Sequence, residues 1–251
     1  MAGHSKFKNI MHRKGRQDAK RAKEFTKVGR EIQVAAKMGD ADPANNPRLR
    51  AAIQAARAVN MPKDRIERAI QAATGGGEGV TYEERRYEGY GAGGIAVIVE
   101  VLTDNINRSA SEVRAAFSKQ GGVLGETGSV AFSFERLGCI KYLASKVERE
   151  TMEEQAIEAG AQDIELGGDE YEVFTDVEDF ALVKEALEEA LGDPIEGKLV
   201  FRPVNTVAVD ENKARSVLKL IDLLEDNDDV QAVYSNLEID DAMLEKLASE
   251  L

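Results

Sequence analysis

Apolar residues in the first 75 positions recur every three or four residues, which is the spacing of one face of an α-helix. Helical patterns begin near Arg16, after Asn46-Pro47 and after Met61-Pro62, since Asn caps helices and Pro fits their first turn. Their apolar faces contain Ala22, Phe25, Val28, Ile32, Ala35 and Ala36 in the first, Leu49, Ile53 and Ala56 in the second, and Ile66, Ala69, Ile70 and Ala73 in the third. The sequence therefore predicts a small helical bundle.

Beyond the glycine-rich segment 75–79, which has the composition of a hinge, strand-like runs alternate with helical spacing. Residues 95–102 are nearly all apolar, as in a buried strand, and residues 107–120 are spaced as a helix. Ser109 and Glu112 have the spacing of a capping box at the start of that helix. This change of period predicts a second region that mixes strands and helices.

Residues 139–202 have the order strand, helix, strand, strand, helix, strand, which is the ferredoxin-like βαββαβ order. Around them, strands are predicted at 129–134, 204–209 and 230–234, with a helix at 212–225. The later segments would complete the sheet begun near Tyr82. The βαββαβ unit is therefore expected as an insertion within another α+β domain.

We thus expect an α+β multidomain protein, with an N-terminal helical bundle followed by two ferredoxin-like α+β domains, one inserted in the other. The expected boundaries are 1–78 for the bundle, 79–136 plus 203–238 for the first α+β domain, 137–202 for the inserted domain and 239–251 for a C-terminal helical tail.

Five basic residues line one side of the first helix, opposite its apolar face. Their spacings of four, three, four and three stack them into one stripe, within an arc of about 80°. They are Arg16, Lys20, Lys23, Lys27 and Arg30. We call them the basic stripe. A helix of this kind can bury one side in a bundle and present a row of cations to a polyanion, although a charged helix face can also be plain solvated surface.

The distribution of charge along the chain favours a polyanion. Residues 1–75 hold 17 Lys+Arg and 7 Asp+Glu, a net charge of +10, whereas residues 76–251 hold 16 and 39, a net charge of −23. Residues 147–193 alone hold 17 acidic and 2 basic residues, a net charge of −15. This asymmetry predicts a nucleic-acid-binding N-terminal part and an acidic part that nucleic acid repels, which suits contact with a basic protein.

Composition excludes several classes of protein. No apolar run approaches the roughly 18 residues of a membrane span, so no membrane partner is expected. The first 15 residues contain no apolar core of a secretory signal, and the lone Cys139 excludes an internal disulfide. A cytoplasmic location is the simplest interpretation. The oligomeric state stays open.

Candidates for catalytic or metal chemistry are few. The only two histidines, His4 and His12, lie among cations near the start and have no further ligands nearby. Glycines between residues 89 and 94 lead into a strand rather than a helix, which indicates a turn and not a dinucleotide loop. No nucleophile, base and orienting partner come together in the sequence. We therefore expect no catalytic residue, no metal and no cofactor.

The candidate residues for a nucleic-acid interface are Lys and Arg side chains of the N-terminal part. The predicted contacts are Lys6, Lys8, Arg13, Lys14, Arg16, Lys20, Lys23, Lys27, Arg30, Arg48 and Arg50. A second polar group follows the buried strand at 95–102, where turn and capping chemistry is one interpretation and a contact surface is the other. Its candidate contacts are Asn105, Asn107, Arg108 and Arg114.

Several segments together resemble the YebC family of probable transcriptional regulatory proteins. These are the opening MAGHSKFKNIMHRKGRQDAKRAKEFTKVGREIQVAAKMGDADPANNPRLRAAI, then NMPKDRIERAI, YEGYGAGGIAVIVEVLTDNINRSASEVRAAFSKQGG, GSVAFSFE and RPVNTV. They follow in the family's order over nearly the whole chain. One departure is Phe7, which stands where the family usually has Trp, so that an aromatic ring remains without the indole N–H.

The resemblance implies a helical first domain followed by two α+β domains, a cytoplasmic location and no known cofactor. For function it implies a DNA-binding transcriptional regulator, whereas mitochondrial relatives are described as translational activators. A row of Lys and Arg contacts phosphates without reading bases, so either nucleic acid suits the basic stripe. The alternative is a ribosome-associated translation factor that binds rRNA or tRNA. An enzyme acting on nucleic acid is the remote third alternative.

Overall fold

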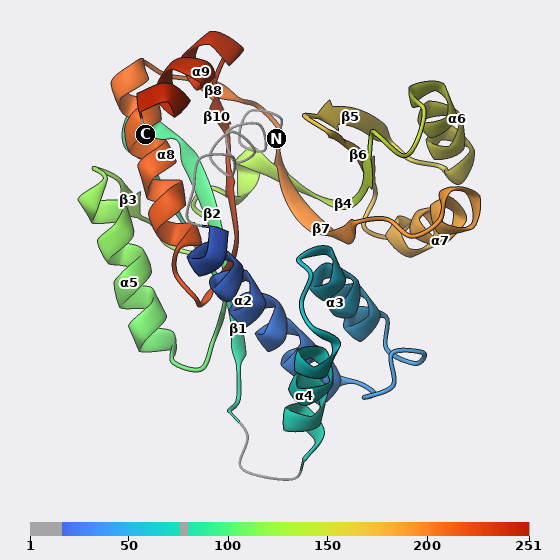
Figure 1. Ribbon diagram of the computed structural model, residues 1–251. Coiled ribbons are helices and arrows are strands. Elements are labelled where there is room, and N and C mark those ends of the chain that lie inside the picture. The colour runs from blue at the N-terminus through green and yellow to red at the C-terminus, as the bar shows by residue number, and fades with distance from the viewer. Residues whose placement is uncertain (1–16, 76–79, 251) are drawn as a thin grey trace. The chain divides into compact units, whose positions relative to one another are not determined.

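The computed structural model describes residues 17–75 and 80–250 (Figure 1). The chain divides into two compact units. One is formed by residues 135–202, and the other by the described residues on either side of that segment. Each unit has a four-stranded sheet and an apolar core of its own.

Three helices form the N-terminal bundle: α2 (Gln17–Met38), α3 (Pro47–Ala58) and α4 (Lys63–Thr74). Their positions confirm the three predicted helices. Asn46 caps α3, because its side chain accepts a hydrogen bond from the backbone N–H of Leu49. The shared core contains Ile32, Ala35, Ala36, Leu49, Ala52, Ile53, Ala56, Met61, Ile66 and Ala69.

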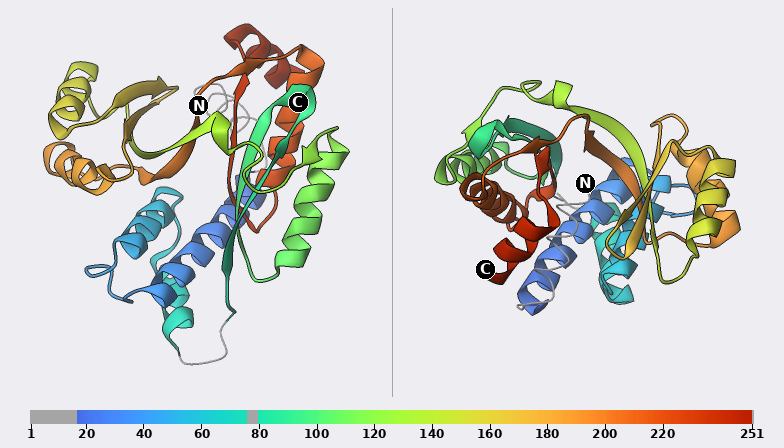
Figure 2. Two further views of the ribbon diagram at one scale, coloured as in Figure 1. Left: turned by 180° about the vertical axis from the view of Figure 1, so that it is seen from behind. Right: turned by 90° about the horizontal axis from the view of Figure 1, so that it is seen from above.

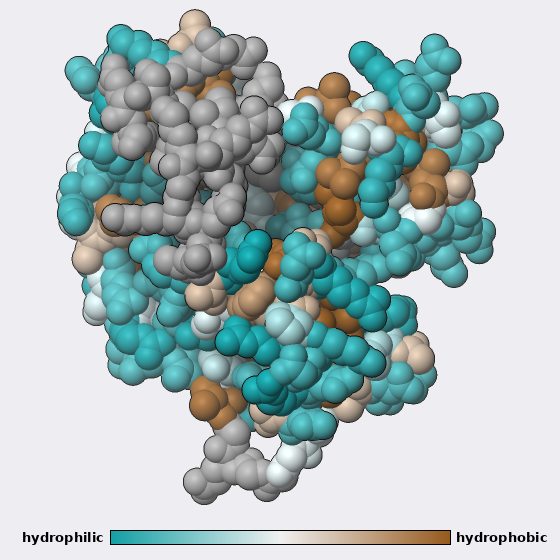
Figure 3. Space-filling view, in the orientation of Figure 1, coloured by the Kyte–Doolittle hydropathy of each residue, from teal (hydrophilic) through white to brown (hydrophobic). Residues whose placement is uncertain are grey.

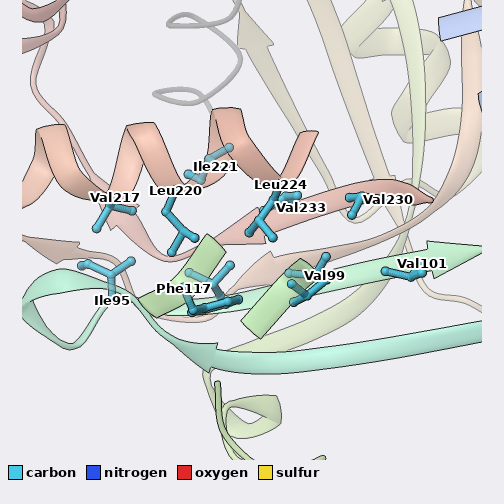
Figure 4. Packing of buried hydrophobic residues seen from close by; sticks show 12 residues of the cluster. Ile95, Val99, Val101, Phe117, Val217, Leu220, Ile221, Leu224, Val230 and Val233 are labelled. Carbon is cyan, nitrogen blue, oxygen red and sulfur yellow. The ribbon is translucent and has the colours of Figure 1, made fainter. Parts of the chain in front are cut away.

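The same unit contains a sheet with the strand order β3-β1-β2-β9. The strands are β1 (Glu83–Tyr90), β2 (Ala96–Thr103), β3 (Val123–Leu124) and β9 (Val230–Ser235). Helices α5 (Ile106–Lys119) and α8 (Glu211–Glu225) pack on one face of it. Figure 4 shows Phe117 of α5 and Leu220 and Leu224 of α8 meeting Val99 of β2 in this core. Along the chain, the β1–β2 hairpin comes before the first helix, α5. The order of elements in this domain therefore differs from βαββαβ.

The turn between β1 and β2 is the glycine-rich segment for which the sequence predicted a turn. Gly93 and Gly94 have φ angles of 77° and 76°, a region that only glycine enters without strain. A short 3-10 helix, η1 (Ala92–Gly94), leads directly into β2. These glycines therefore build a strand connection.

Three local predictions about this domain were wrong. Residues 129–134 do not form one strand, because Gly128 turns the chain with φ 90° and a 3-10 turn, η2 (Ala131–Ser133), follows. Of residues 204–209, only β8 (Val207–Ala208) is extended in a ladder, and it pairs in parallel with β10 (Leu237–Glu238) outside the larger sheet. Helix α5 is capped by Asn105 and not by Ser109.

The unit of residues 135–202 contains the βαββαβ order that the sequence predicted. Its elements are β4 (Phe134–Leu143), α6 (Arg149–Ala159), β5 (Asp163–Gly167), β6 (Glu170–Thr175), α7 (Phe180–Leu191) and β7 (Glu196–Pro203). The strand order β5-β6-β4-β7 is the ferredoxin-like order. Figure 2 shows α6 and α7 side by side on one face of this sheet, where Met152, Val183 and Leu187 are buried.

A last helix, α9 (Asp241–Glu250), lies within the predicted C-terminal helical tail and buries Leu244 and Leu247. Together, the bundle and the two antiparallel sheets with their helices confirm the predicted α+β class, with a helical region first and α+β domains after it.

Candidate nucleic-acid interface

Cations of the basic stripe contact the C-terminal end of α8. Lys23 Nζ lies 2.5 Å from Asp226 Oδ1 and donates to the Asp226 carbonyl at 2.9 Å. Lys27 Nζ donates to the Glu225 carbonyl at 2.5 Å. The last carbonyls of a helix lack intrahelical donors and carry the negative end of its dipole, so they favour cations. The stripe therefore holds α2 against α8.

Arg30 continues this contact into the loop after α8. Its Nη1 donates to the Asp228 carbonyl at 3.0 Å and lies 2.5 Å from Asp229 Oδ1. The side chain of Asp229 is only 4% exposed. Its carboxylate accepts hydrogen bonds from Arg30 Nη1, Thr103 Oγ1, Arg108 Nη2 and Ser109 Oγ. Burial alone would raise the pKa of Asp229, but these donors lower it to about 2.

Three members of the basic stripe thus have oxygen partners inside the chain, and a phosphate would have to displace those partners to reach Lys23, Lys27 or Arg30. Arg16 lies outside the described residues, and for Lys20 only the helical backbone is described. Phosphate binding by the stripe stays a prediction.

The other predicted contacts of the N-terminal part differ in the hydrogen bonds that they form within the protein. Arg48 donates from Nε and Nη2 to the Glu31 carboxylate at 2.7 and 3.1 Å, and from Nη2 to Glu84 at 2.5 Å. The hydrogen bond to Glu31 and the negative charges of Glu31 and Glu84 raise the pKa of Arg48 above its ordinary value. Arg50 donates to two backbone carbonyls of the loop before α3. Lys6, Lys8, Arg13 and Lys14 lie outside the described residues.

The second polar group is divided between structural contacts and exposed side chains. Asn105 accepts a hydrogen bond from the Arg108 N–H and so caps α5. The Arg108 guanidinium lies 2.7 Å from both Asp104 Oδ1 and Asp229 Oδ2. Asn107 and Arg114 are exposed on α5. Turn and capping chemistry therefore accounts for two of the four predicted contacts.

The structure also reveals cations that the sequence prediction did not include. Each is exposed to solvent on the bundle, and Figure 3 shows strongly hydrophilic side chains gathered over it. They are Arg21 and Lys37 on α2, Arg57 on α3, and Lys63, Arg65 and Arg68 on α4. Lys63 and Arg68 form ion pairs one helical turn away, which are weak at exposed sites. The spacing of apolar residues in α4 is a sequence signal that could have identified these cations as solvent-exposed.

Within the described residues, no group of three His, Cys, Asp or Glu side chains is arranged to hold a metal ion. Burial raises the pKa of the Cys139 thiol to about 12, so this buried residue is a poor nucleophile. None of the described helices has the length and apolar character needed to cross a bilayer.

Comparison with known proteins gave two family matches and a similar structure. The model of the TACO1/YebC protein N-terminal domain matches residues 5–76, and that of the TACO1/YebC second and third domain matches residues 82–237. The chain is also 45% identical to a conserved hypothetical protein from Aquifex aeolicus whose crystal structure is known. That likeness covers 89% of this chain and 93% of the other, with a TM-score of 0.84.

Proposed function

Because the chain belongs to the TACO1/YebC family, we propose that it is a non-enzymatic regulatory protein that binds nucleic acid through its basic N-terminal bundle. In this proposal the protein acts in the cytoplasm as a DNA-binding transcriptional regulator. Phosphates of the nucleic-acid backbone are the groups that the bundle contacts, because a scattered set of Lys and Arg side chains neutralises charge without reading bases.

The observation that carries the proposal is the separation of charge between the two ends of the chain. Residues 1–75 have a net charge of +10, although the whole chain has −13. In the described part of this segment, Arg21, Arg57 and Arg65 are exposed and form neither an ion pair nor a side-chain hydrogen bond with another described residue. Lys37 and Arg50 are exposed as well, but they donate hydrogen bonds to neighbouring oxygens. Arg21, Arg57 and Arg65 are therefore the described cations that a phosphate reaches at the least cost.

A second candidate function is a translation factor on the ribosome, and the acidic segment 147–193 favours it. Most of its carboxylates are exposed, as basic ribosomal proteins would require of a partner. The exposed ones are Glu148, Glu150, Glu154, Glu158, Asp163, Asp169, Asp176, Glu178, Asp179, Glu185, Glu189 and Asp193.

The salt dependence of affinity for duplex DNA tests the proposed contacts. Each phosphate contact contributes about −0.9 to the slope of log K against log salt. We expect the double variant Arg21→Ala/Arg57→Ala to make the slope less steep by about 1.8. The proposal fails for duplex DNA if the wild type does not bind at low salt, or if this variant keeps the wild-type slope.

The variant Lys23→Ala/Lys27→Ala is the matched control, because it removes the same charge from residues that contact α8. We expect an unchanged slope and a lower melting temperature. A slope that is less steep by about 1.8 would instead show that phosphate displaces the α8 oxygens from these lysines, as the sequence pattern predicted. Cosedimentation with ribosomes that survives DNase and depends on Arg21 and Arg57 would favour the second candidate function.

A further inference from the structure

A cavity of about 400 Å³ lies between α2 and α4. Its walls come from both helices, from the loop between α3 and α4, and from the residues just before β1. They include Phe25, Gly29, Arg30, Arg65, Arg68 and Tyr82. None of the described residues that line it is acidic. The volume falls in the range of about 300 to 1,000 Å³ that is typical of small-ligand sites.

Gly29 lines this cavity at a point where the space is open. It lies in the middle of α2, where glycine costs about 0.5 to 1 kcal/mol relative to alanine. Its φ is not positive, so the backbone does not require glycine. A Cβ placed there meets no heavy atom within 4 Å, which means that no neighbouring helix requires glycine either. The empty space beside Gly29 thus has no structural explanation within the described residues.

Two pairs of an arginine and an aromatic ring line that space. The Arg65 guanidinium lies 5.4 Å from the centre of the Phe25 ring, and the Arg30 guanidinium lies 5.5 Å from that of Tyr82. Arg30 is held in place by Asp229, whereas Arg65 has no ion-pair partner among the described residues. Arg68 lies on the same wall, one turn along α4, in an exposed pair with Asp64. The cavity therefore combines flat apolar surfaces with a guanidinium available to an anion.

A nucleotide has one part that is complementary to the aromatic rings and one that is complementary to the guanidinium. Its base presents a flat π surface, which stacks on aromatic rings and on guanidinium planes, and its phosphate pairs with arginine. A base inside a duplex is stacked and paired, so it cannot enter a cavity in a protein unless it leaves the stack. The combination of aromatic side chains and arginines is the one by which proteins hold unpaired strands.

We propose that the cavity between α2 and α4 binds one unpaired nucleotide of a single-stranded nucleic acid. The base lies against Phe25 and Tyr82, and the phosphate lies at Arg65 and Arg68. This inference rests on the proposed function for its class of ligand. It shares Arg65 with the exposed cations named above, but its test at Gly29 leaves Arg21 and Arg57 unchanged. It gives the protein a preference for single strands over duplexes.

Filling the cavity tests the proposal. Gly29→Leu adds a side chain where no protein atom stands, and Gly29→Ala is the matched control that adds only a methyl group. We expect Gly29→Leu to weaken binding of a fluorescent single strand of about 12 nucleotides by about tenfold, measured by anisotropy. Gly29→Ala should stay within about twofold of the wild type, and duplex affinity should change in neither variant. Both variants should melt no lower than the wild type, because each replaces a helical glycine.

A second pair of variants tests the guanidinium. Arg65→Gln removes a charge inside the cavity, and Arg57→Gln removes the same charge outside it. We expect Arg65→Gln to lower single-strand affinity more than Arg57→Gln, and both to lower duplex affinity equally. RNA and DNA strands of one sequence show whether the 2′-hydroxyl contributes.

The results separate the two proposals. Wild-type affinity of Gly29→Leu for single strands overturns the cavity as the site, even if the salt dependence for duplex DNA supports phosphate binding by the bundle. Binding of adenosine 5′-monophosphate without any binding of strands overturns the single-strand ligand and shows a site for a free nucleotide. If the wild type binds neither strands nor duplexes at low salt, both proposals fail.

Discussion

Asp229 joins three elements of the larger unit through its carboxylate. Arg30 brings α2 to it, Thr103 brings the end of β2, and Arg108 with Ser109 brings the first turn of α5. Because the side chain is nearly fully buried, its charge is stabilised by these donors and not by water. The bundle is therefore linked to the sheet and to α5 through a buried charge.

This residue predicts a pH-dependent stability. Its folded-state pKa of about 2 is below the ordinary value of 3.8, so the stabilisation is complete above about pH 4 and is lost as the pH falls toward 2. We expect Asp229→Asn to lower the free energy of unfolding by about 2 to 4 kcal/mol at pH 7. The difference from the wild type should shrink below pH 4. Urea unfolding followed by circular dichroism measures both.

The neighbouring Asp228 provides the control, since its side chain is exposed and only its carbonyl contacts Arg30. Asp228→Asn should change the free energy of unfolding by less than about 0.5 kcal/mol at any pH. Equal effects of the two variants would contradict the role assigned to the buried carboxylate.

At the scale of elements, the junction between α2 and α3 depends on one amide. Asn46 Oδ1 accepts from the Leu49 N–H at 3.0 Å, and its Nδ2 donates to the carbonyls of Ala35 at 2.8 Å and Asp40 at 2.7 Å. It is 6% exposed. One side chain thus caps α3 and also satisfies a carbonyl near the end of α2.

We expect Asn46→Ala to destabilise the protein by about 2 to 3 kcal/mol, because the cap is lost and the carbonyls of Ala35 and Asp40 lose the hydrogen bonds that the Asn46 amide donates. Asn46→Asp keeps the cap but not the donors, so it should fall between alanine and the wild type. The exposed neighbour Asn45 is the control, and Asn45→Ala should have little effect on the thermal melting temperature. Equal melting temperatures for Asn46→Ala and Asn45→Ala would refute this role.

Elements could be predicted from the sequence where their signals are local. The start of α3 follows from Asn46-Pro47, and the apolar spacing gives the buried face of each bundle helix. The cap of α5 is local too, since Asn105 accepts from the Arg108 N–H, but Ser109 offered a competing capping box. Sequence could not show that the Ser109 hydroxyl bonds to Asp229, 120 residues away. Likewise, the spacing of the basic stripe is visible in the sequence, but its contact with α8 depends on tertiary structure. Nothing local distinguishes Gly29 from other helical glycines.

At the scale of the whole molecule, the unit of residues 135–202 is inserted into the other unit at one position. The Val204 N–H donates to the Ser133 carbonyl at 3.0 Å, so the two ends of the other unit are adjacent. The unit holds 19 Asp+Glu and 7 Lys+Arg, a net charge of −12. Its removal therefore leaves a short gap and removes most of the net negative charge of the chain, which is −13.

We expect a chain in which a short Gly-Ser linker replaces residues 135–202 to keep the fold of the larger unit. Its affinity for nucleic acid should rise, most clearly at low salt, because repulsion between phosphate and the acidic unit is removed. Circular dichroism and duplex-binding titrations measure the two effects. Lower affinity at low salt in a folded deletion variant would show that the acidic unit contributes contacts of its own.

The contacts of Lys23 and Lys27 with the end of α8 can form only late in synthesis of the chain. Lys23 and Asp226 are 203 residues apart, and Lys27 and Glu225 are 198 apart. At about 5 to 20 residues per second, the ribosome makes the acidic end of α8 about 10 to 40 seconds after the cations of α2. During that interval Lys23 and Lys27 have no α8 oxygen to contact, so a phosphate that binds them then has neither Asp226 nor Glu225 to displace.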